Sequence, residues 1–145
     1  VIPVLKQNAV ITHGDLDQLN IIWDKADQPI LIDWESARRM NPTREIVRTC
    51  LGWSGIETEN VSIKIYKNML KTYNKSCDLF NENHLNAALF AIVGSLVFWM
   101  LYNIDIACNS IEIENTNTAI KEVNGVLKSF PRLHYLIPDL LKIKA

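Results

Sequence analysis

The sequence predicts an α+β fold that is mainly helical, and two observations carry this prediction. The chain has 145 residues and is 48% hydrophobic, which is enough for one compact core and too little for two ordinary domains. Short apolar runs separated by turns occupy the chain up to residue 40, and longer segments with helical spacing follow. We therefore expect a single domain over 1–145, with a small β-hairpin region followed by a helical bundle.

Three short strands are predicted in the first part of the chain. The apolar runs at 9–12, 19–23 and 29–32 have strand length and are bounded by turn residues. The polar segment 24–28 should form the hairpin turn between the second and third strands. Pro29 is compatible with this assignment because proline is tolerated as the first residue of a strand.

A change from strands to helices is expected at Asn41. A capping side chain followed by Pro42 is a typical helix start, and Gly52 and Gly55 should end this first helix or place a turn after it. Further helices are expected over 59–73, 81–107, from Thr116 or Thr118 to 130, and over 133–143. The spacing in 59–73 should bury Tyr66 and Met69 or Leu70 and expose the lysines. The helix that ends at 130 should carry an apolar stripe of Ile120, Val123, Val126, Leu127 and Phe130. Proline residues should break the chain between the last two helices, at Pro131, and kink the last one, at Pro138.

The segment 87–102 contains no charged residue and is strongly apolar. A membrane-spanning helix needs about 20 apolar residues, and this run is shorter and contains Gly94 and Ser95. We therefore expect a buried central helix and no membrane span. The net charge of −1 also gives no field for nucleic acid or an anionic membrane surface.

Three cysteines, Cys50, Cys77 and Cys108, are widely spaced and odd in number. They lack the C-x-x-C spacing of a zinc site or redox motif, and they do not suggest a disulfide framework. We interpret them as reduced, buried or half-buried thiols of a cytoplasmic protein.

The most informative motif is His13-Gly14-Asp15, with Asn20 five residues after the aspartate and Asp33 after a later apolar run. The hairpin between these segments should bring the polar side chains to one end of the same small sheet. Phosphoryl transfer needs a carboxylate that accepts the proton of the attacking hydroxyl, and oxygen ligands that hold Mg²⁺ against the phosphates. Asp15 suits the first role, and Asn20 with Asp33 suits the second.

The segment 11–20 resembles the catalytic loop of protein kinases in an H-G-D-x-x-x-x-N form. Together with Asp-Trp-Glu at 33–35, it is similar to aminoglycoside phosphotransferases and their relatives, which include choline, homoserine and methylthioribose kinases. The resemblance covers residues 9–48 closely. It implies a protein-kinase-like C-terminal lobe, with catalytic and metal-binding loops within 9–40 and a helical substrate-binding part over 41–145.

The resemblance implies roles for individual residues. Asp15 would be the catalytic base, and Asn20 and Asp33 would bind magnesium, with ATP as phosphoryl donor. His13 would support the loop by hydrogen bonding, and Glu35 would support the metal site or the substrate wall. One departure concerns position 17, where this sequence has an aspartate and protein kinases have a lysine that touches the transferred phosphate.

The parts of a kinase that grip the nucleotide are not recognisable in this sequence. It contains no G-x-G-x-x-G loop and no V-A-x-K strand. We expect a separate N-terminal lobe to supply them, and we expect this chain alone to be inactive. Apolar surface that would pack on such a lobe should favour self-association.

The acceptor is left open by the sequence. Residues 76–120 contain no lysine or arginine, so a local acidic surface there would favour a cationic acceptor such as an aminoglycoside, in which case the protein would be a resistance enzyme, or an amino alcohol. A solvated acidic face without a ligand explains the same composition equally well. The main hypothesis is a kinase for a small-molecule hydroxyl, with choline, homoserine and sugars as further acceptors. The alternatives are a non-catalytic kinase-like binding module and a helical interaction domain.

Overall fold

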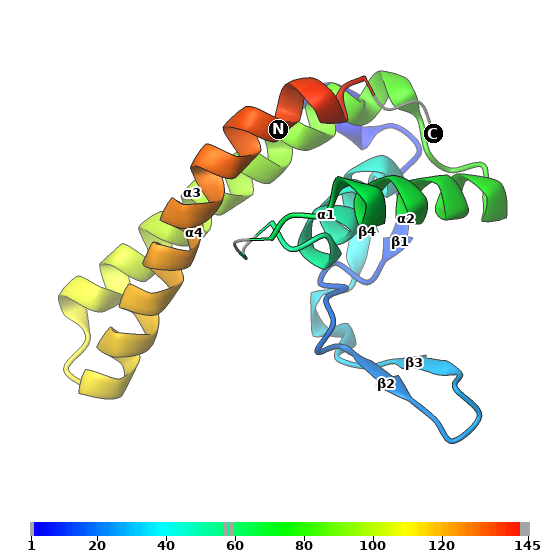
Figure 1. Ribbon diagram of the computed structural model, residues 1–145. Helices are drawn as coiled ribbons and strands as arrows, with labels where there is room; N and C mark the ends of the chain where they lie inside the picture. Colours follow the sequence, from blue (N-terminus) through cyan, green and yellow to red (C-terminus); the bar gives the residue numbers. More distant parts are fainter. Residues whose placement is uncertain (1, 57, 59, 143–145) are drawn as a thin grey trace.

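The computed structural model describes residues 2–56, 58 and 60–142 of the chain. Its order of elements confirms the predicted α+β class, with strands and short turns first and long helices after them (Figure 1). The strands are β1 (Val10–Thr12), β2 (Ile21–Trp23), β3 (Pro29–Leu31) and β4 (Arg38–Met40). The α-helices are α1 (Pro42–Trp53), α2 (Ile63–Ser76), α3 (Leu85–Asn109) and α4 (Ile113–Leu140). Single 3₁₀ turns lie at Pro3–Lys6 (η1), Trp34–Ser36 (η2) and Glu82–His84 (η3).

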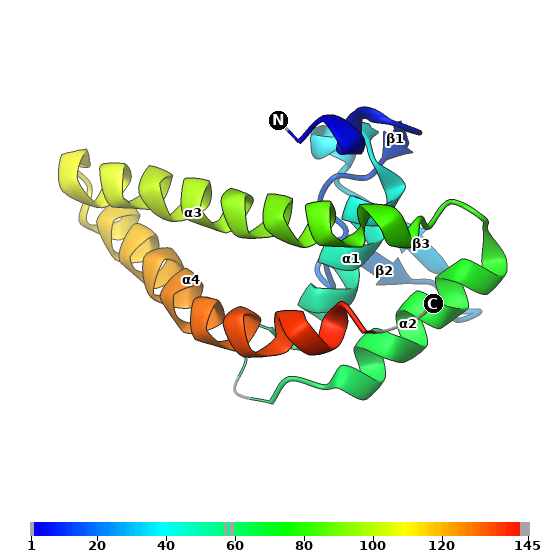
Figure 2. The ribbon, with the colours of Figure 1, turned by 90° about the horizontal axis from the view of Figure 1, so that it is seen from above.

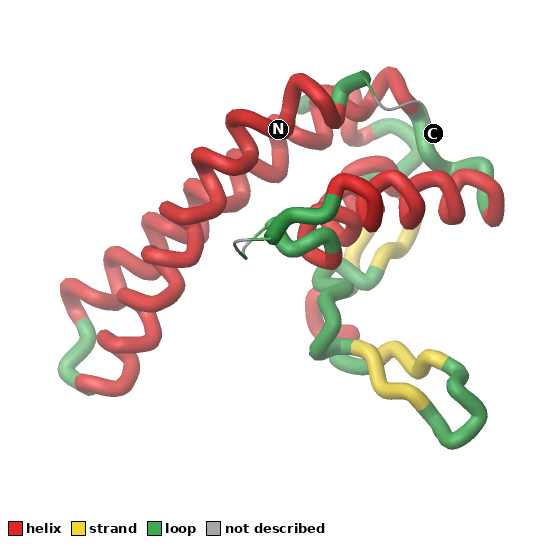
Figure 3. Tube along the Cα trace, in the orientation of Figure 1, coloured by secondary structure: helices red, strands yellow, loops and turns green. Residues whose placement is uncertain are grey.

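The strands form two separate antiparallel pairs, where the sequence had suggested one small sheet. β2 pairs with β3 in the predicted hairpin, which begins its second strand at Pro29. β1 pairs with β4, a strand that the sequence analysis did not predict. The β2–β3 hairpin projects from the rest of the molecule (Figure 3). The segment that leads into β4 reads Ser36-Ala37-Arg38-Arg39 and contains no run of large apolar residues. No sequence signal therefore marks a strand here.

Helix α1 starts at the predicted position and lies at the centre of the helical part. The side chain of Asn41 caps it by accepting hydrogen bonds from the backbone N–H groups of Thr43 and Arg44, at 3.0 and 3.4 Å. The helix ends at Trp53, and Gly55 follows in a turn with φ of +83°. Both predicted boundaries of this helix therefore agree with the structure.

The hydrophobic core is built around α1 and joins all four α-helices. Its buried members on the first two helices are Val47, Cys50, Leu51, Tyr66 and Leu70, and those on the last two are Leu85, Leu89, Ile92, Leu133 and Leu140. Because α1 contacts both α2 and α3, it is fixed from two sides. Ile56 and Phe80, which lie in connections between helices, complete the core.

Helix α2 begins and ends later than predicted. Ser62 caps it by accepting a hydrogen bond from the backbone N–H of Ile65, and the helix ends at Ser76. The predicted first residue, Glu59, lies outside the described residues. As expected from its spacing, the helix buries Tyr66 and Leu70 and exposes its lysines.

The prediction of a buried helix at 87–102 is wrong for most of its length. Only the first half of α3 reaches the core, with Leu85, Leu89 and Ile92 buried in it and Val93 and Leu96 partly buried against it. The rest runs outward beside α4 as a helical hairpin (Figure 2), and Phe98 is 73% exposed. The physical reason is that α3 is apolar all round, so its composition does not tell which face has a neighbour.

The helix passes a length and composition test for a membrane span over Glu82–Asn109, and 22% of its most apolar window is buried inside the protein. One helix of this kind is weak evidence for a membrane span, so it assigns no membrane by itself.

Helix α4 is one continuous helix where a break at Pro131 and two helices were predicted. It begins at Ile113, before the expected threonines, and passes through Pro131 and Pro138. Both prolines are exposed, while Val126, Ser129, Leu133 and Leu140 are buried. Packing of these buried residues against α3 and the core offsets the local cost of each proline, which is about 3 kcal/mol.

Two further expectations about burial need correction. Cys50 is buried and Cys77 is half-buried, as expected, but Cys108 near the end of α3 is exposed. The predicted apolar stripe of α4 is also only partly buried, since Ile120 and Leu127 are 47% and 51% exposed. Both errors occur in the part of the hairpin that extends away from the core.

Candidate active site

The two strand pairs bring two loops face to face. The register of β1 with β4 places Thr12 opposite Arg38, and the register of β2 with β3 places Ile21 opposite Leu31. The segments 13–20 and 32–37 therefore start and end at neighbouring points and run between the same two ladders. A backbone hydrogen bond of 3.1 Å from the N–H of Ile32 to the carbonyl of Asn20 joins them directly.

Gly14 is required by the path of the first loop. Its φ is +82°, a region that residues with a Cβ rarely occupy. A Cβ on Gly14 would also overlap the backbone carbonyl of Ser36 in the facing loop. The loops can therefore approach each other this closely only with glycine at position 14.

Asp15 and Asn20 are held together, as the predicted motif requires. The amide nitrogen Nδ2 of Asn20 donates a hydrogen bond of 2.7 Å to the backbone carbonyl of Asp15 and lies 3.5 Å from its carboxylate Oδ2. Asn20 is buried, and Asp15 is half-buried. Since the nitrogen of the Asn20 amide is engaged by Asp15, the amide oxygen Oδ1 is left as the group that can bind a cation.

Asp33 lies at the start of the facing loop, one residue after Ile32. It is exposed, with φ of +60°, and its carboxylate makes no hydrogen bond or ion pair within the described part of the chain. Aspartate is among the few residues that tolerate this left-handed conformation. The ladder connection between Asn20 and Ile32 places Asp33 next to Asn20 along the backbone of the site.

His13, in the first loop, forms a hydrogen bond to the second loop. It is 5% exposed, and its Nε2–H donates a hydrogen bond of 2.8 Å to the backbone carbonyl of Ile32. Its ring lies 4.7 Å from the ring of Trp34. The indole of Trp34 in turn donates to the carbonyl of Leu31. These contacts hold the backbone at Leu31 and Ile32, directly before Asp33, the candidate metal ligand.

Glu35 and Asp17 do not contact the side chains of Asp15, Asn20 and Asp33 within the described residues. Glu35 is exposed, and its carboxylate contacts none of the other predicted site residues within the described chain. Asp17 has a local role: its Oδ1 accepts hydrogen bonds from the backbone N–H groups of Leu19 and Asn20, at 2.7 and 3.1 Å. The aspartate at position 17 therefore shapes the loop that ends at Asn20.

Two functional candidates on α1 were missed by the sequence analysis. Glu45 Oε1 accepts a hydrogen bond of 2.8 Å from the backbone N–H of Gly14. Arg48 donates to the carbonyl of Gly14 and to Oδ1 of Asp15, at 2.6 and 2.8 Å. The signal available in the sequence was an opposite-charge pair three residues apart on a helix whose other face is apolar.

Three arginines and Glu45 lie close together at this end of α1, beside Asp15. Burial lowers the pKa of Arg44, and the neighbouring guanidinium groups of Arg38 and Arg48 lower it further. These neighbours show that three arginines lie close enough to interact electrostatically beside the loop of Asp15. Such a cluster favours an anion such as a phosphate group.

A match to a family of known proteins supports the motif. Residues 2–68 match the phosphotransferase enzyme family. The phosphotransferase match includes His13, Asp15, Asn20, Asp33 and all of α1, and it confirms the predicted family over this segment. It supports a kinase-type enzyme in general. No curated protein and no solved structure matches the chain.

The donor set of the segment that matches this family fits magnesium better than a transition metal. In the described part of the chain, no three histidine, cysteine, aspartate or glutamate side chains gather to hold a metal ion. Asn20 and Asp33 instead offer one amide oxygen and one carboxylate, both hard oxygen donors. Mg²⁺ typically takes one or two protein ligands and completes its shell with phosphate and water.

Proposed function

We propose that this chain is the catalytic lobe of an ATP-dependent phosphotransferase that acts on a hydroxyl group of a small molecule. The main support is the arrangement of Asn20, whose nitrogen binds Asp15 while its oxygen has no hydrogen bond within the described residues. Phosphoryl transfer needs a base and a metal ligand, and this arrangement holds the two candidates next to each other. The family match over residues 2–68 points to the same class of reaction.

In the proposed reaction, Asp15 accepts the proton of the acceptor hydroxyl. The hydroxyl oxygen forms a new bond to the γ-phosphorus of ATP, the bond from that phosphorus to the β–γ bridging oxygen breaks, and ADP leaves. Asn20 and Asp33 would hold Mg²⁺, which supplies charge neutralisation on the phosphates when it is bound. Because catalysis of this reaction consists mainly of positioning and electrostatics, few protein groups are needed.

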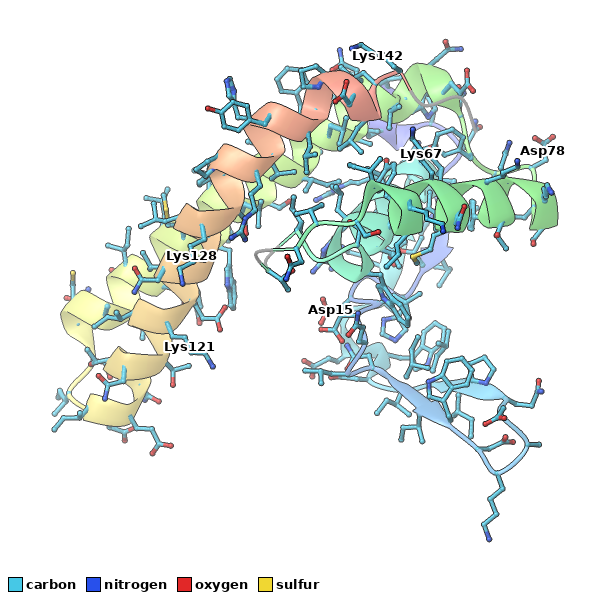
Figure 4. All side chains as sticks on the ribbon, viewed as in Figure 1. Asp15, Lys67, Asp78, Lys121, Lys128 and Lys142 are labelled. Atoms are coloured by element: carbon cyan, nitrogen blue, oxygen red, sulfur yellow. The ribbon has the colours of Figure 1, made fainter. Side chains whose placement is uncertain are left out.

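The proposed function belongs to a protein in which this lobe is joined to a lobe that grips the nucleotide. The sequence supplies the base and the metal ligands, and it carries no phosphate-covering glycine loop. The acceptor is proposed from the family resemblance as an aminoglycoside, choline, homoserine or a sugar. The hypothesis of a cationic acceptor remains a prediction, and Asp78 of the acidic interval lies beyond the end of α2, in a different part of the molecule from Asp15 (Figure 4).

Replacement of Asp15 tests the proposed role of the base. Asp15→Asn keeps the shape of the side chain and removes its ability to accept a proton, so kcat should fall about 100-fold or more. The measurement is ADP release with Mg²⁺ and ATP across a panel of acceptors, on the protein that contains both lobes. Asp27→Asn is the matched control, because Asp27 lies in the β2–β3 turn with φ of +55° and has no place in the site.

Asp33→Asn extends the same test to the metal. Asparagine also tolerates the left-handed backbone at this position, so the substitution removes a charge without adding strain. The Mg²⁺ concentration needed for half-maximal activity should rise, while Asp27→Asn should leave it unchanged.

Full activity of Asp15→Asn would contradict the mechanism. Nucleotide binding without transfer to any acceptor would favour the non-catalytic binding module.

A further inference from the structure

Helix α1 holds the peptide groups on both sides of Gly14. Glu45 accepts the N–H of this residue, and Arg48 donates to its carbonyl through one guanidinium nitrogen. The second terminal nitrogen of Arg48 donates to the Asp15 carboxylate. Two side chains, one helical turn apart, therefore fix the loop at three polar groups in succession.

The helix that carries these side chains is a rigid support. Val47, Cys50 and Leu51 are 0%, 0% and 3% exposed and join the core shared with α2 and α3. The start of the helix is capped by Asn41, which is 1% exposed. A side chain anchored on such an element is held more precisely than one carried by a loop.

The ion pair between Arg48 and Asp15 is too exposed to be explained by stability alone. The two side chains are 48% and 42% exposed, and ion pairs of this exposure contribute little to folding because solvent screens them. Its geometry is more informative, because a planar guanidinium with two engaged nitrogens fixes both the direction and the distance of the carboxylate. The contact therefore fits a positioning role.

We propose that Arg48 is a positioning residue that aims the carboxylate of Asp15 at the acceptor hydroxyl. This inference rests on the proposed function, because it assigns Arg48 to the same reaction. Arg48 engages Oδ1, and Asn20 lies at 3.5 Å from Oδ2, so Oδ2 keeps the capacity to accept the proton of the acceptor. Arg48 thus restrains one oxygen of the base and leaves the other for chemistry.

The test compares Arg48→Ala, Arg48→Lys and the matched control Arg39→Ala. Arg39 is also exposed and also donates to a backbone carbonyl, that of Ala9, which lies outside both loops. The first measurement uses the 145-residue chain and needs no activity. Hydrogen exchange at the amides of Gly14 and Asp15 should accelerate roughly tenfold in Arg48→Ala, because two charge-assisted hydrogen bonds are lost. Arg39→Ala should leave it unchanged.

The second measurement is the phosphoryl-transfer rate in the protein that also contains the nucleotide lobe. A displaced base should lower kcat about 100-fold in Arg48→Ala, with the KM of the acceptor near its original value. Lysine at this position cannot make the forked contact, so Arg48→Lys should recover only part of the rate. Added guanidinium ion should restore part of the activity of Arg48→Ala and none of that of Asp15→Asn.

The outcomes separate this inference from the proposed function. Unchanged amide exchange in Arg48→Ala, or a raised KM with normal kcat, would overturn the positioning role. An increase in exchange with the predicted loss of kcat and guanidinium rescue would support it. If the protein that contains both lobes transfers no phosphate to any acceptor, the proposed function fails. Arg48 then has no role in that reaction, and faster amide exchange in Arg48→Ala would show only that Arg48 orders the loop.

Discussion

At position 14, two independent constraints apply to the same residue. The backbone has φ of +82°, and the facing carbonyl of Ser36 occupies the space where a Cβ would lie. The first constraint disfavours any side chain, and the second would force the two loops apart. A residue next to the proposed base is thus fixed by the contact between the loops and by its own dihedral angle.

Gly14→Ala should therefore lower the free energy of unfolding by about 1–3 kcal/mol. Gly125→Ala is the matched control, because a Cβ at Gly125 meets no atom within 4 Å and the residue lies inside helix α4. Alanine there should raise the free energy of unfolding by up to about 1 kcal/mol. Urea denaturation of both variants measures the difference. Equal stability of the two variants would contradict the requirement for glycine at position 14.

The sequence predicted that Asp15 and Asn20 lie together, and it missed the contacts that Glu45 and Arg48 make with the same loop. Asp15 and Asn20 lie five positions apart in one loop, so their proximity is recorded in the chain itself. Glu45 and Arg48 lie about 30 positions later and reach the loop only because α1 packs beside it. Local patterns do not contain this information, since long-range contacts depend on how elements are arranged.

At the scale of elements, α1 links the core to the proposed site. One face of the helix buries Cys50 and Val47, and another carries the side chains that hold the Gly14–Asp15 loop. Burial raises the pKa of the Cys50 thiol to about 12. The thiol is therefore held neutral in the folded protein at pH values where it ionises in the unfolded chain.

Cys50 should make stability fall at alkaline pH. The pKa of this thiol is higher in the folded protein than in the unfolded chain. The stabilisation of the folded state that follows from this difference is fully present below the unfolded pKa of about 8.5, and it is lost as pH rises from there towards about 12. Between pH 8.5 and 10 the free energy of unfolding should fall by about 2 kcal/mol from this group alone. Cys50→Ala should be less stable at pH 7 but should show a smaller alkaline decline.

Cys108→Ala is the control for this prediction, because Cys108 is exposed and has no core contact to lose. It should keep the alkaline decline of the unmodified protein. Denaturant unfolding at pH 7, 8.5 and 10 gives the comparison. A decline of the same size in Cys50→Ala would show that other groups cause it.

At the scale of the whole molecule, the α3–α4 hairpin leaves apolar side chains in solvent. On α3 the exposed residues Phe90, Val97 and Ile104 recur every seven positions. On α4 the exposed residues Ile113, Ile120 and Leu127 do the same. Seven-residue spacing of apolar residues is typical of helices that pack against other helices along a seam. Self-association was expected from apolar surface that packs on a nucleotide-binding lobe, and we propose these two rows as a further apolar surface for it.

The chain should therefore associate with itself in a concentration-dependent way. Sedimentation velocity over a range of concentrations should show an increasing sedimentation coefficient for the unmodified chain. The double variant Val97→Glu with Ile120→Glu should remain monomeric, because it places buried charges in any seam formed by the two rows. Asn86→Glu with Asn117→Glu adds the same charge at exposed positions outside the rows and should still associate. A monomer at every concentration would contradict the prediction.

The sequence by itself determined the spacing of His13, Asp15 and Asn20, the mainly helical class, the start of α1 and the β2–β3 hairpin. These features depend on neighbouring residues: a capping side chain, a turn, or a fixed spacing of polar groups. Only the tertiary structure decided the pairing of β1 with β4, the continuity of α4 through two prolines, and the contacts of Glu45 and Arg48 with the loop of Asp15. It also decided that most of α3 is exposed. An apolar pattern shows which residues share a helix face, whereas the presence of a neighbour against that face depends on the packing of the whole chain.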